Sequence, residues 1–129
     1  MTRISMSMRQ LREFCQVDSR LAEILEDLAD VWPIETLYVT SIARTPEEDG
    51  ALNASGIHAC GPPHRALDVR IRTLPDNYQE TAEYLAESLN KCWMYDYNRP
   101  DKVVCYAKVH GSGPHMHLQV HANTVRNRG

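Results

Sequence analysis

The sequence predicts an α+β fold in which a small, mostly antiparallel sheet has helices packed on one side. Three observations indicate this class. Segments 17–32 and 77–92 place apolar residues at the spacing of a helix face, whereas segments 65–71 and 115–121 alternate apolar and polar residues as strands do. The expected elements follow one another in the order ααβ–βα–ββ. Such mixed runs of helices and strands, ending in a hairpin, are typical of α+β domains.

Three segments predict helices. The segment 17–32 has an apolar stripe with acidic residues elsewhere, and Pro33 prevents its continuation. A shorter helix is expected over about 6–15, and a further one over about 77–92. The apolar stripes consist of Val17, Leu21, Ile24, Leu25, Leu28, Val31 and Trp32; of Met8, Leu11, Phe14 and Cys15; and of Tyr78, Ala82, Leu85, Ala86, Leu89 and Cys92.

Four segments predict strands. The segment 36–43 is rich in residues that favour strands and is expected to be buried, and 65–71 follows as a second strand. The segments 103–109 and 115–121 are separated by a turn containing Gly-Ser-Gly-Pro, which predicts a hairpin. The long connection 45–64 is rich in Gly, Pro, Asn and Ser. Connections of this length in compact domains are usually functional or disordered.

Composition limits the class of protein. The chain of 129 residues fits one domain, 1–129, with one hydrophobic core. A net charge of −3 gives no case for nucleic acid or an anionic membrane surface as a partner. Because no segment resembles a membrane span or a secretion signal, we expect synthesis in the cytoplasm without a signal peptide. We also expect a monomer.

The four cysteines predict neither a thiolate metal site nor a disulfide framework. They include no Cys-x-x-Cys pair. Cys15, Cys92 and Cys105 fall on apolar positions of periodic segments, so we expect small, buried, reduced side chains.

A row of histidines near the C-terminus carries the strongest chemical signal. The run from His115 to His121 alternates, and a strand would direct its odd and even positions to opposite faces. Neutral imidazole is the commonest metal ligand in proteins. The alternation therefore predicts a metal site on one face and core on the other. The odd positions are His115, His117, Gln119 and His121, and the even ones are Met116, Leu118 and Val120.

An aspartate in the strand 65–71 points to the same chemistry. Asp68 interrupts an apolar run, and a carboxylate in such a place needs a cation, a metal or backbone donors as a partner. The alternative is a salt bridge with one of three nearby arginines, Arg65, Arg70 or Arg72. A catalytic zinc site takes three protein ligands and one water. Histidine and aspartate from a loop and two strands supply suitable ligands.

The motifs Ser55-Gly56-Ile57-His58, Arg65-Ala66-Leu67-Asp68-Val69 and His115-Met116-His117 resemble, in this order, those of the LAS-type zinc peptidases. These include D-Ala-D-Ala carboxypeptidases, L-alanyl-D-glutamate endopeptidases of phage endolysins and murein endopeptidases, and hedgehog domains share their fold. The resemblance spans about 37–121. It implies a hedgehog/DD-peptidase-like fold with Zn²⁺ bound by His58, Asp68 and His117. It also implies that Arg44 stabilises the tetrahedral intermediate, although Arg44 could instead pair with a neighbouring glutamate.

The sequence departs from the family pattern at two places. His58 and Asp68 are ten residues apart where the family usually has seven, so His64 is an alternative first ligand. Pro114 occupies the position, three residues before His117, where many members carry a catalytic glutamate. We expect His115 to act as the general base; the alternatives are that it only orients a ligand, or that His110 takes this role.

The resemblance implies a function in cell-wall degradation. The expected activity is a zinc-dependent peptidase that cleaves the peptide part of bacterial peptidoglycan, as a phage or prophage endolysin does. Such an enzyme acts at the cell wall after release by a lysis protein, or as part of a virion. The alternative is a catalytically inactive zinc-binding module of the same fold, with a role in binding or virion structure. A third interpretation is a metal-free scaffold whose histidines face solvent.

Overall fold

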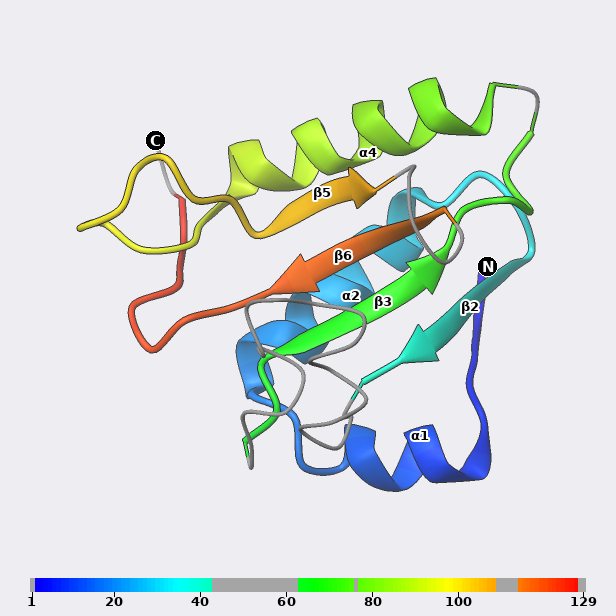
Figure 1. Ribbon diagram of the computed structural model, residues 1–129, viewed down its shortest axis with the longest axis horizontal. Coiled ribbons are helices and arrows are strands. Elements are labelled where there is room, and N and C mark those ends of the chain that lie inside the picture. Colours follow the sequence, from blue (N-terminus) through cyan, green and yellow to red (C-terminus); the bar gives the residue numbers. More distant parts are fainter. Residues whose placement is uncertain (1, 43–62, 76, 109–113, 128–129) are drawn as a thin grey trace.

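The computed structural model describes residues 2–42, 63–75, 77–108 and 114–127 (Figure 1). Its elements form an α+β arrangement with a mostly antiparallel sheet, which confirms the predicted fold class at this level. In chain order they are β1 (Arg3–Ser5), α1 (Met8–Phe14), α2 (Ser19–Val31), β2 (Thr36–Ser41), β3 (Ala66–Arg70), α4 (Tyr78–Cys92), β4 (Trp93–Met94), β5 (Cys105–Lys108), β6 (His115–Gln119) and β7 (Val125–Arg126).

The main sheet has five strands in the order β1-β2-β3-β6-β5. Only β1 and β2 run parallel; every other neighbouring pair is antiparallel. A register shift between Val39 and Ser41 interrupts the pairing of β2 with β3. Strands β4 and β7 form a separate two-stranded sheet. The sequence analysis predicted β2, β3, β5 and β6 but not the very short β1, β4 and β7.

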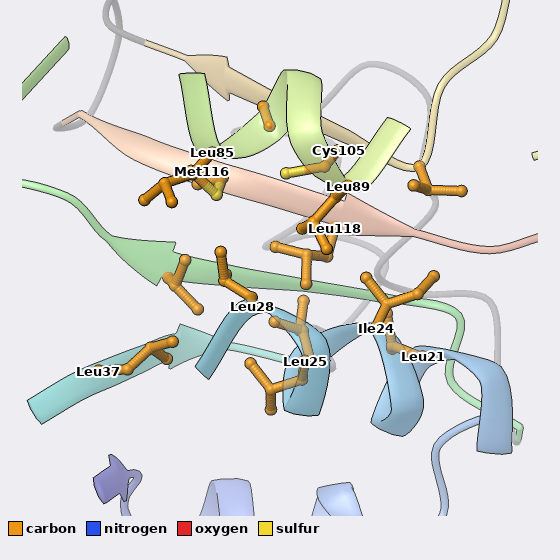
Figure 2. Close-up of a cluster of buried hydrophobic side chains, with 14 of the residues drawn as sticks. Leu21, Ile24, Leu25, Leu28, Leu37, Leu85, Leu89, Cys105, Met116 and Leu118 are labelled. Carbon is orange, nitrogen blue, oxygen red and sulfur yellow. The ribbon is translucent and has the colours of Figure 1, made fainter. Parts of the chain in front are cut away.

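Helices α2 and α4 pack against one face of the main sheet (Figure 2). Inward side chains of β3 and β6 meet leucines from both helices in a single core cluster. Burying one such side chain stabilises the fold by about 1.5–3 kcal/mol, so this face fixes how the sheet and helices pack. The fully buried members include Leu21, Leu25 and Leu28 of α2, Leu67 and Val69 of β3, and Met116 and Leu118 of β6.

Helix α1 differs from α2 and α4 because it buries none of its residues completely. Met8 and Leu11 belong to its predicted apolar stripe, yet both are exposed. The helix begins with a reciprocal capping box between Ser7 and Gln10. Local capping, more than burial, therefore defines this element.

The ends of α2 follow from local chemistry. Asp18 caps the N-terminus by accepting a hydrogen bond from the backbone N–H of Arg20. Trp32 is extended at the other end, as expected for a residue that precedes a proline. The helix thus occupies most of the predicted segment 17–32.

The prediction that Cys15, Cys92 and Cys105 are all buried is wrong for two of them. Cys15 and Cys92 are exposed, and only Cys105 is buried as predicted; all three are reduced. Cys15 caps the end of α1 and Cys92 is the last residue of α4, where the helix periodicity no longer dictates burial.

Among the described helices, none combines the length and apolar character needed to cross a membrane.

Candidate metal centre

Asp68 and His117 face each other across two neighbouring strands. Their Cα atoms are register partners in the antiparallel pair β3–β6. The Asp68 Oδ1 atom lies 2.9 Å from Nδ1 of His117, and each residue is only 2% exposed. The strands thus bring a carboxylate and an imidazole from positions 49 residues apart into direct contact.

Strand alternation explains why this polar pair is outside the core. Leu67 and Val69 flank Asp68, while Met116 and Leu118 flank His117, and all four apolar side chains belong to the core beneath α2 and α4. Side chains at the intervening positions must point to the opposite face of the sheet. Burying either polar group alone is costly, so their contact offsets part of this cost.

The other ring nitrogen of His117 has a partner as well. Its Nε2 lies 3.2 Å from Oε1 of Gln119, two residues further along β6. The Gln119 amide is held in turn, because its Nε2 donates a 2.9 Å hydrogen bond to the backbone carbonyl of Val103. The amide therefore presents its oxygen, an acceptor, to the His117 ring.

Two acceptors thus flank one imidazole. A neutral imidazole carries a single N–H and can donate to only one of them. If Nε2 carries the hydrogen and donates to Gln119, the lone pair of Nδ1 points toward Asp68. A cation placed there would be bound by both Nδ1 and Oδ1, and the Gln119 contact matches the outer hydrogen bond that metal-binding histidines usually make.

Tyr106 of β5 forms the neighbouring wall of the site. Its ring lies 5.0 Å from the His117 ring, centroid to centroid, and the two residues are register partners. Burial, and to a smaller extent the negative charge of Asp68, raises the pKa of the Tyr106 phenol. The hydroxyl therefore keeps its proton at neutral pH and acts as a hydrogen-bond donor.

His115 lies beside this pair but is more accessible. Its Nε2 is 3.7 Å from the same Oδ1 of Asp68, and its side chain is 18% exposed compared with 2% for His117. The two histidines occupy alternate positions of β6, on one face, as the sequence pattern predicts. Of the two imidazoles, that of His115 is therefore the one that solvent or a ligand can reach.

The two donor types of this pair are ones that zinc accepts. The 2.9 Å between Asp68 Oδ1 and His117 Nδ1 is a hydrogen-bond distance, whereas two ligands about 2.0–2.1 Å from a tetrahedral zinc ion lie about 3.3 Å apart. Imidazole nitrogen and carboxylate oxygen are both common zinc ligands. Across the described ranges, however, no three His, Cys, Asp or Glu side chains gather closely enough to hold a metal. Asp68 and His117 alone fall short of the three protein ligands of a catalytic zinc site.

Of the five site residues predicted from sequence, the structure brings three together: Asp68, His115 and His117. The other two, His58 and Arg44, lie outside the described residues, as does His110.

His64, the alternative first ligand, belongs to a different neighbourhood. Its backbone accepts from the N–H of Asp18 and donates to the carbonyl of Gln16, and it forms an isolated bridge with Val17. Since no three potential ligands gather within the part of the chain that is described, His64 does not complete a set with Asp68 and His117.

The salt-bridge alternative for Asp68 is not what the structure shows. Arg65 pairs with Asp18 at 3.6 Å, and the Arg70 guanidinium lies 5.5 Å from the ring centroid of Tyr38. The Asp68 carboxylate contacts two imidazoles instead. His121 is also separate from this pair, because its Nδ1 lies 3.5 Å from Oδ2 of Asp96.

The sequence analysis missed two residues of the site, Gln119 and Tyr106. Gln119 was noted only as a member of the polar row, yet its position two residues after His117 was a usable signal for a contact on the same face. Tyr106 gave no comparable signal, because its contact with His117 depends on the register of β5 against β6.

Comparisons of the chain with protein-family models, with curated proteins and with solved structures find no match. Functional inference therefore depends on the site itself.

Proposed function

We propose that this protein is a zinc-dependent peptidase with a hedgehog/DD-peptidase-like fold, acting on the peptide part of bacterial peptidoglycan. The observation that carries the proposal is the buried contact between Asp68 and His117 on the sheet face opposite the helices. In it, one imidazole nitrogen faces a carboxylate while the other faces a fixed amide oxygen. A metal cation bound by Nδ1 of His117 and Oδ1 of Asp68 would use this arrangement, with Nε2 donating to Gln119.

Asp68 and His117 would hold the metal from two adjacent strands, with His58 as the third ligand that the motif resemblance implies. When bound, zinc would supply Lewis-acid activation of a water molecule and of a substrate carbonyl. Gln119 would keep the His117 ring in the orientation that directs Nδ1 toward Asp68. The strands, rather than loops, set the positions of these two ligands, which favours a well-defined geometry.

His115 is the residue best suited to move a proton. It lies on the same face as His117, is partly open to solvent and contacts the Asp68 carboxylate. It would take a proton from the attacking water and return it to the leaving amine. Arg44 would stabilise the negative charge that develops on the carbonyl oxygen, a role whose loss costs roughly a hundred- to a thousandfold in rate in studied enzymes.

The substrate class and the site of action come from the resemblance of the three motifs. A peptidoglycan peptidase of this kind would act at the cell wall after release by a lysis protein, or as part of a virion, as endolysin-like phage enzymes do. No nucleic-acid or membrane partner is part of the proposal.

The test combines metal content with hydrolysis. Untagged full-length protein should contain about one zinc per chain by elemental mass spectrometry and should cleave soluble peptidoglycan fragments. His117→Ala should lose both properties, whereas His115→Ala should keep zinc and lose hydrolysis. The matched control is His121→Ala, which removes an imidazole outside the site and should change neither.

Metal-free wild-type protein, or undiminished hydrolysis by a folded His117→Ala variant, would contradict the proposal. Because His117 is buried and its truncation could prevent folding, Asp68→Asn provides a second variant that preserves the side-chain volume. Circular dichroism establishes whether each variant is folded.

A second candidate function is a zinc-binding module without catalysis. The observation that favours it is Pro114, located where many family members carry a catalytic glutamate, together with the absence of any carboxylate in the sequence between Asp101 and His117. This candidate predicts zinc in the wild-type protein and no hydrolysis of any peptidoglycan fragment. The activity assay alone separates the two functions, since both require the metal.

A further inference from the structure

A carboxylate and an imidazole that the proposed function does not use face each other beyond the ends of β4 and β6. Asp96 lies two residues after β4 and is only 3% exposed. His121 lies two residues after β6, and its side chain is 33% exposed. Their segments meet because β7, which follows His121, pairs with β4. The Oδ2 atom of Asp96 is 3.5 Å from Nδ1 of His121.

The same nitrogen of His121 already has another partner. Nδ1 accepts a 3.1 Å hydrogen bond from the backbone N–H of Asn123. Because an accepting nitrogen presents a lone pair, the single hydrogen of the neutral ring is on Nε2. The neutral ring therefore has no hydrogen to donate to Asp96, and the 3.5 Å between Nδ1 and Oδ2 is longer than an ordinary hydrogen bond. In this state the imidazole closes the turn after β6.

The two oxygens of the Asp96 carboxylate differ in their contacts. Oδ1 accepts from the backbone N–H of Asn98 at 2.9 Å and from the side-chain amide of Asn123 at 3.2 Å. Oδ2 is 3.9 Å from Nε of Arg99, which is too far for a hydrogen bond. The hydrogen bond from Asn98 is the main reason that the pKa of Asp96 is lowered, so the group stays ionised in mildly acidic solution. Oδ2 is therefore a charged acceptor for a further donor.

The other charged or titratable groups around His121 do not replace this carboxylate. Arg20 of α2 donates to two backbone carbonyls of the turn and pairs with Asp18. Arg65, just before β3, pairs with Asp18 too. The Tyr95 ring lies 5.6 Å from the His121 ring, centroid to centroid, and burial raises the pKa of its phenol, which keeps it uncharged. In the described part of the chain, the carboxylate within ion-pairing distance of the imidazole is that of Asp96.

We propose that His121 is a pH-dependent latch that exchanges Asn123 for Asp96 as the partner of its Nδ1 atom. The neutral ring accepts from the Asn123 N–H. When the ring takes up a proton from solvent, as histidine does in the mildly acidic range, Nδ1 carries a hydrogen and can no longer accept. It then donates to Oδ2 of Asp96, and the Asn123 N–H is released. A charge-assisted hydrogen bond thereby joins the end of β6 to the segment after β4.

The exchange is confined to one hydrogen bond of the turn. The backbone N–H of His121 donates to the Thr124 hydroxyl oxygen at 2.7 Å, and this hydroxyl donates to the carbonyl of Tyr95 at 2.7 Å. Neither bond uses an imidazole nitrogen, so both persist when the ring is protonated. The latch acts without a metal and does not depend on the proposed peptidase function.

NMR of the full-length chain without added zinc, from pH 8 to pH 5, tests the latch. At pH 8 the ring ¹⁵N shifts of His121 should show the Nε2–H tautomer. As the ring is protonated, the exchange rate of the Asn123 amide, corrected for its intrinsic pH dependence, should rise about fivefold, the equivalent of one ordinary hydrogen bond. The ¹³C signal of the Asp96 carboxylate should move with the same midpoint. The Asn127 amide, which donates to the Cys92 carbonyl in the same C-terminal segment, is the internal control and should not change.

Two variants separate the roles of the partners. His121→Phe keeps a ring beside Tyr95 but has no nitrogen, so the Asn123 amide should exchange at the faster rate at every pH. Asp96→Asn keeps an oxygen for the contacts of Oδ1 but loses the charge, so release of the Asn123 amide should need more acid than in wild type. Asp101→Asn is the matched control, because Asp101 is an exposed carboxylate five residues further along the chain. It should behave as wild type.

Three results in the wild-type protein would each overturn the latch. They are an Nδ1–H tautomer of His121 at pH 8, an Asn123 amide that does not respond when the ring is protonated, and equal acceleration of the Asn127 amide, which would mean general opening of the segment. None of the three needs a variant, so they remain decisive if His121→Phe or Asp96→Asn does not fold.

Discussion

His117 and Gln119 are adjacent on one face of β6, and the amide oxygen of Gln119 lies 3.2 Å from the Nε2 atom of the His117 ring. The amide cannot freely reverse, because its nitrogen already donates to the carbonyl of Val103. The Gln119 contact thereby helps to hold the His117 ring with Nδ1 facing Asp68.

Replacing Gln119 should weaken metal binding without removing a ligand. Gln119→Leu keeps a side chain of similar size but loses the acceptor, and zinc affinity measured by chelator competition should fall about 10- to 100-fold. Gln119→Glu keeps an acceptor and should lose less. The ¹⁵N NMR shifts of His117 in the metal-free protein provide an independent readout, since they distinguish the two ring tautomers. Gln79→Leu, an exposed site on α4, serves as control. Wild-type affinity in Gln119→Leu would show that the contact does not orient the ligand.

Asn90 of α4 should be important for stability, because it anchors β5 to the helix. Its amide nitrogen donates to the carbonyl of Cys105, and its oxygen accepts from the backbone N–H groups of Val104 and Cys105. Asn90→Ala should lower the free energy of unfolding by about 2 kcal/mol, even though alanine favours the helix. Urea denaturation measures the change. Asn98→Ala removes an exposed side chain and should remain within about 0.5 kcal/mol of wild type.

The ion pair at the start of α2 should make stability depend on pH under acidic conditions. The side-chain hydrogen bond from Arg20 lowers the pKa of Asp18 below its ordinary value of 3.8. A depressed carboxyl pKa stabilises the folded state above the unfolded value, and this contribution disappears as the pH falls through the lower, folded value. Wild type should therefore be more stable than Asp18→Asn at neutral pH, and the difference should shrink below about pH 4.

Denaturation of wild type, Asp18→Asn and the exposed control Asp30→Asn at several pH values tests this expectation. A wild-type advantage over Asp18→Asn that stays constant down to the most acidic point would contradict it. Arg20 also donates to the backbone carbonyls of Ala122 and Thr124, so the same interaction fastens the C-terminal segment to α2.

Thiol reactivity should separate the described cysteines into two groups. Cys15 and Cys92 are exposed and should react with iodoacetamide in the native protein. Cys105 is fully buried, and burial raises the pKa of its thiol far above neutrality, so it should react only after unfolding. Peptide mapping by mass spectrometry, with and without urea, identifies the modified residues. Native labelling of Cys105 at the rate of Cys92 would show that β5 opens readily.

The elements that could be predicted from sequence are those with a strong local period. The alternation in 115–121 correctly assigns Met116 and Leu118 to the core and His117 to the other face, because the side-chain direction in a strand depends only on position. Strands β4 and β7 have two residues each, too few to establish any period. Their pairing depends on contacts between distant segments.

The site shows the same division between local and long-range information. Residue chemistry alone was enough to select Asp68 and His117, since each is a polar residue in an apolar run. Their pairing across β3 and β6 depends on sheet register, which no single segment contains. The role of Gln119 depends on the Val103 carbonyl, supplied by a segment on the far side of the hairpin turn. Metal binding and catalysis themselves remain predictions.

The opposition of Asp68 and His117 also links assembly of the centre to correct folding of the sheet. If β3 and β6 slid past each other by a single residue, the carboxylate would lose its imidazole, and leucine or methionine would turn outward in their place. Misaligned molecules would therefore lack the proposed metal site, and a metal bound there would shift the equilibrium toward the aligned sheet. A metal at the proposed site would thus stabilise the same sheet register that creates the site.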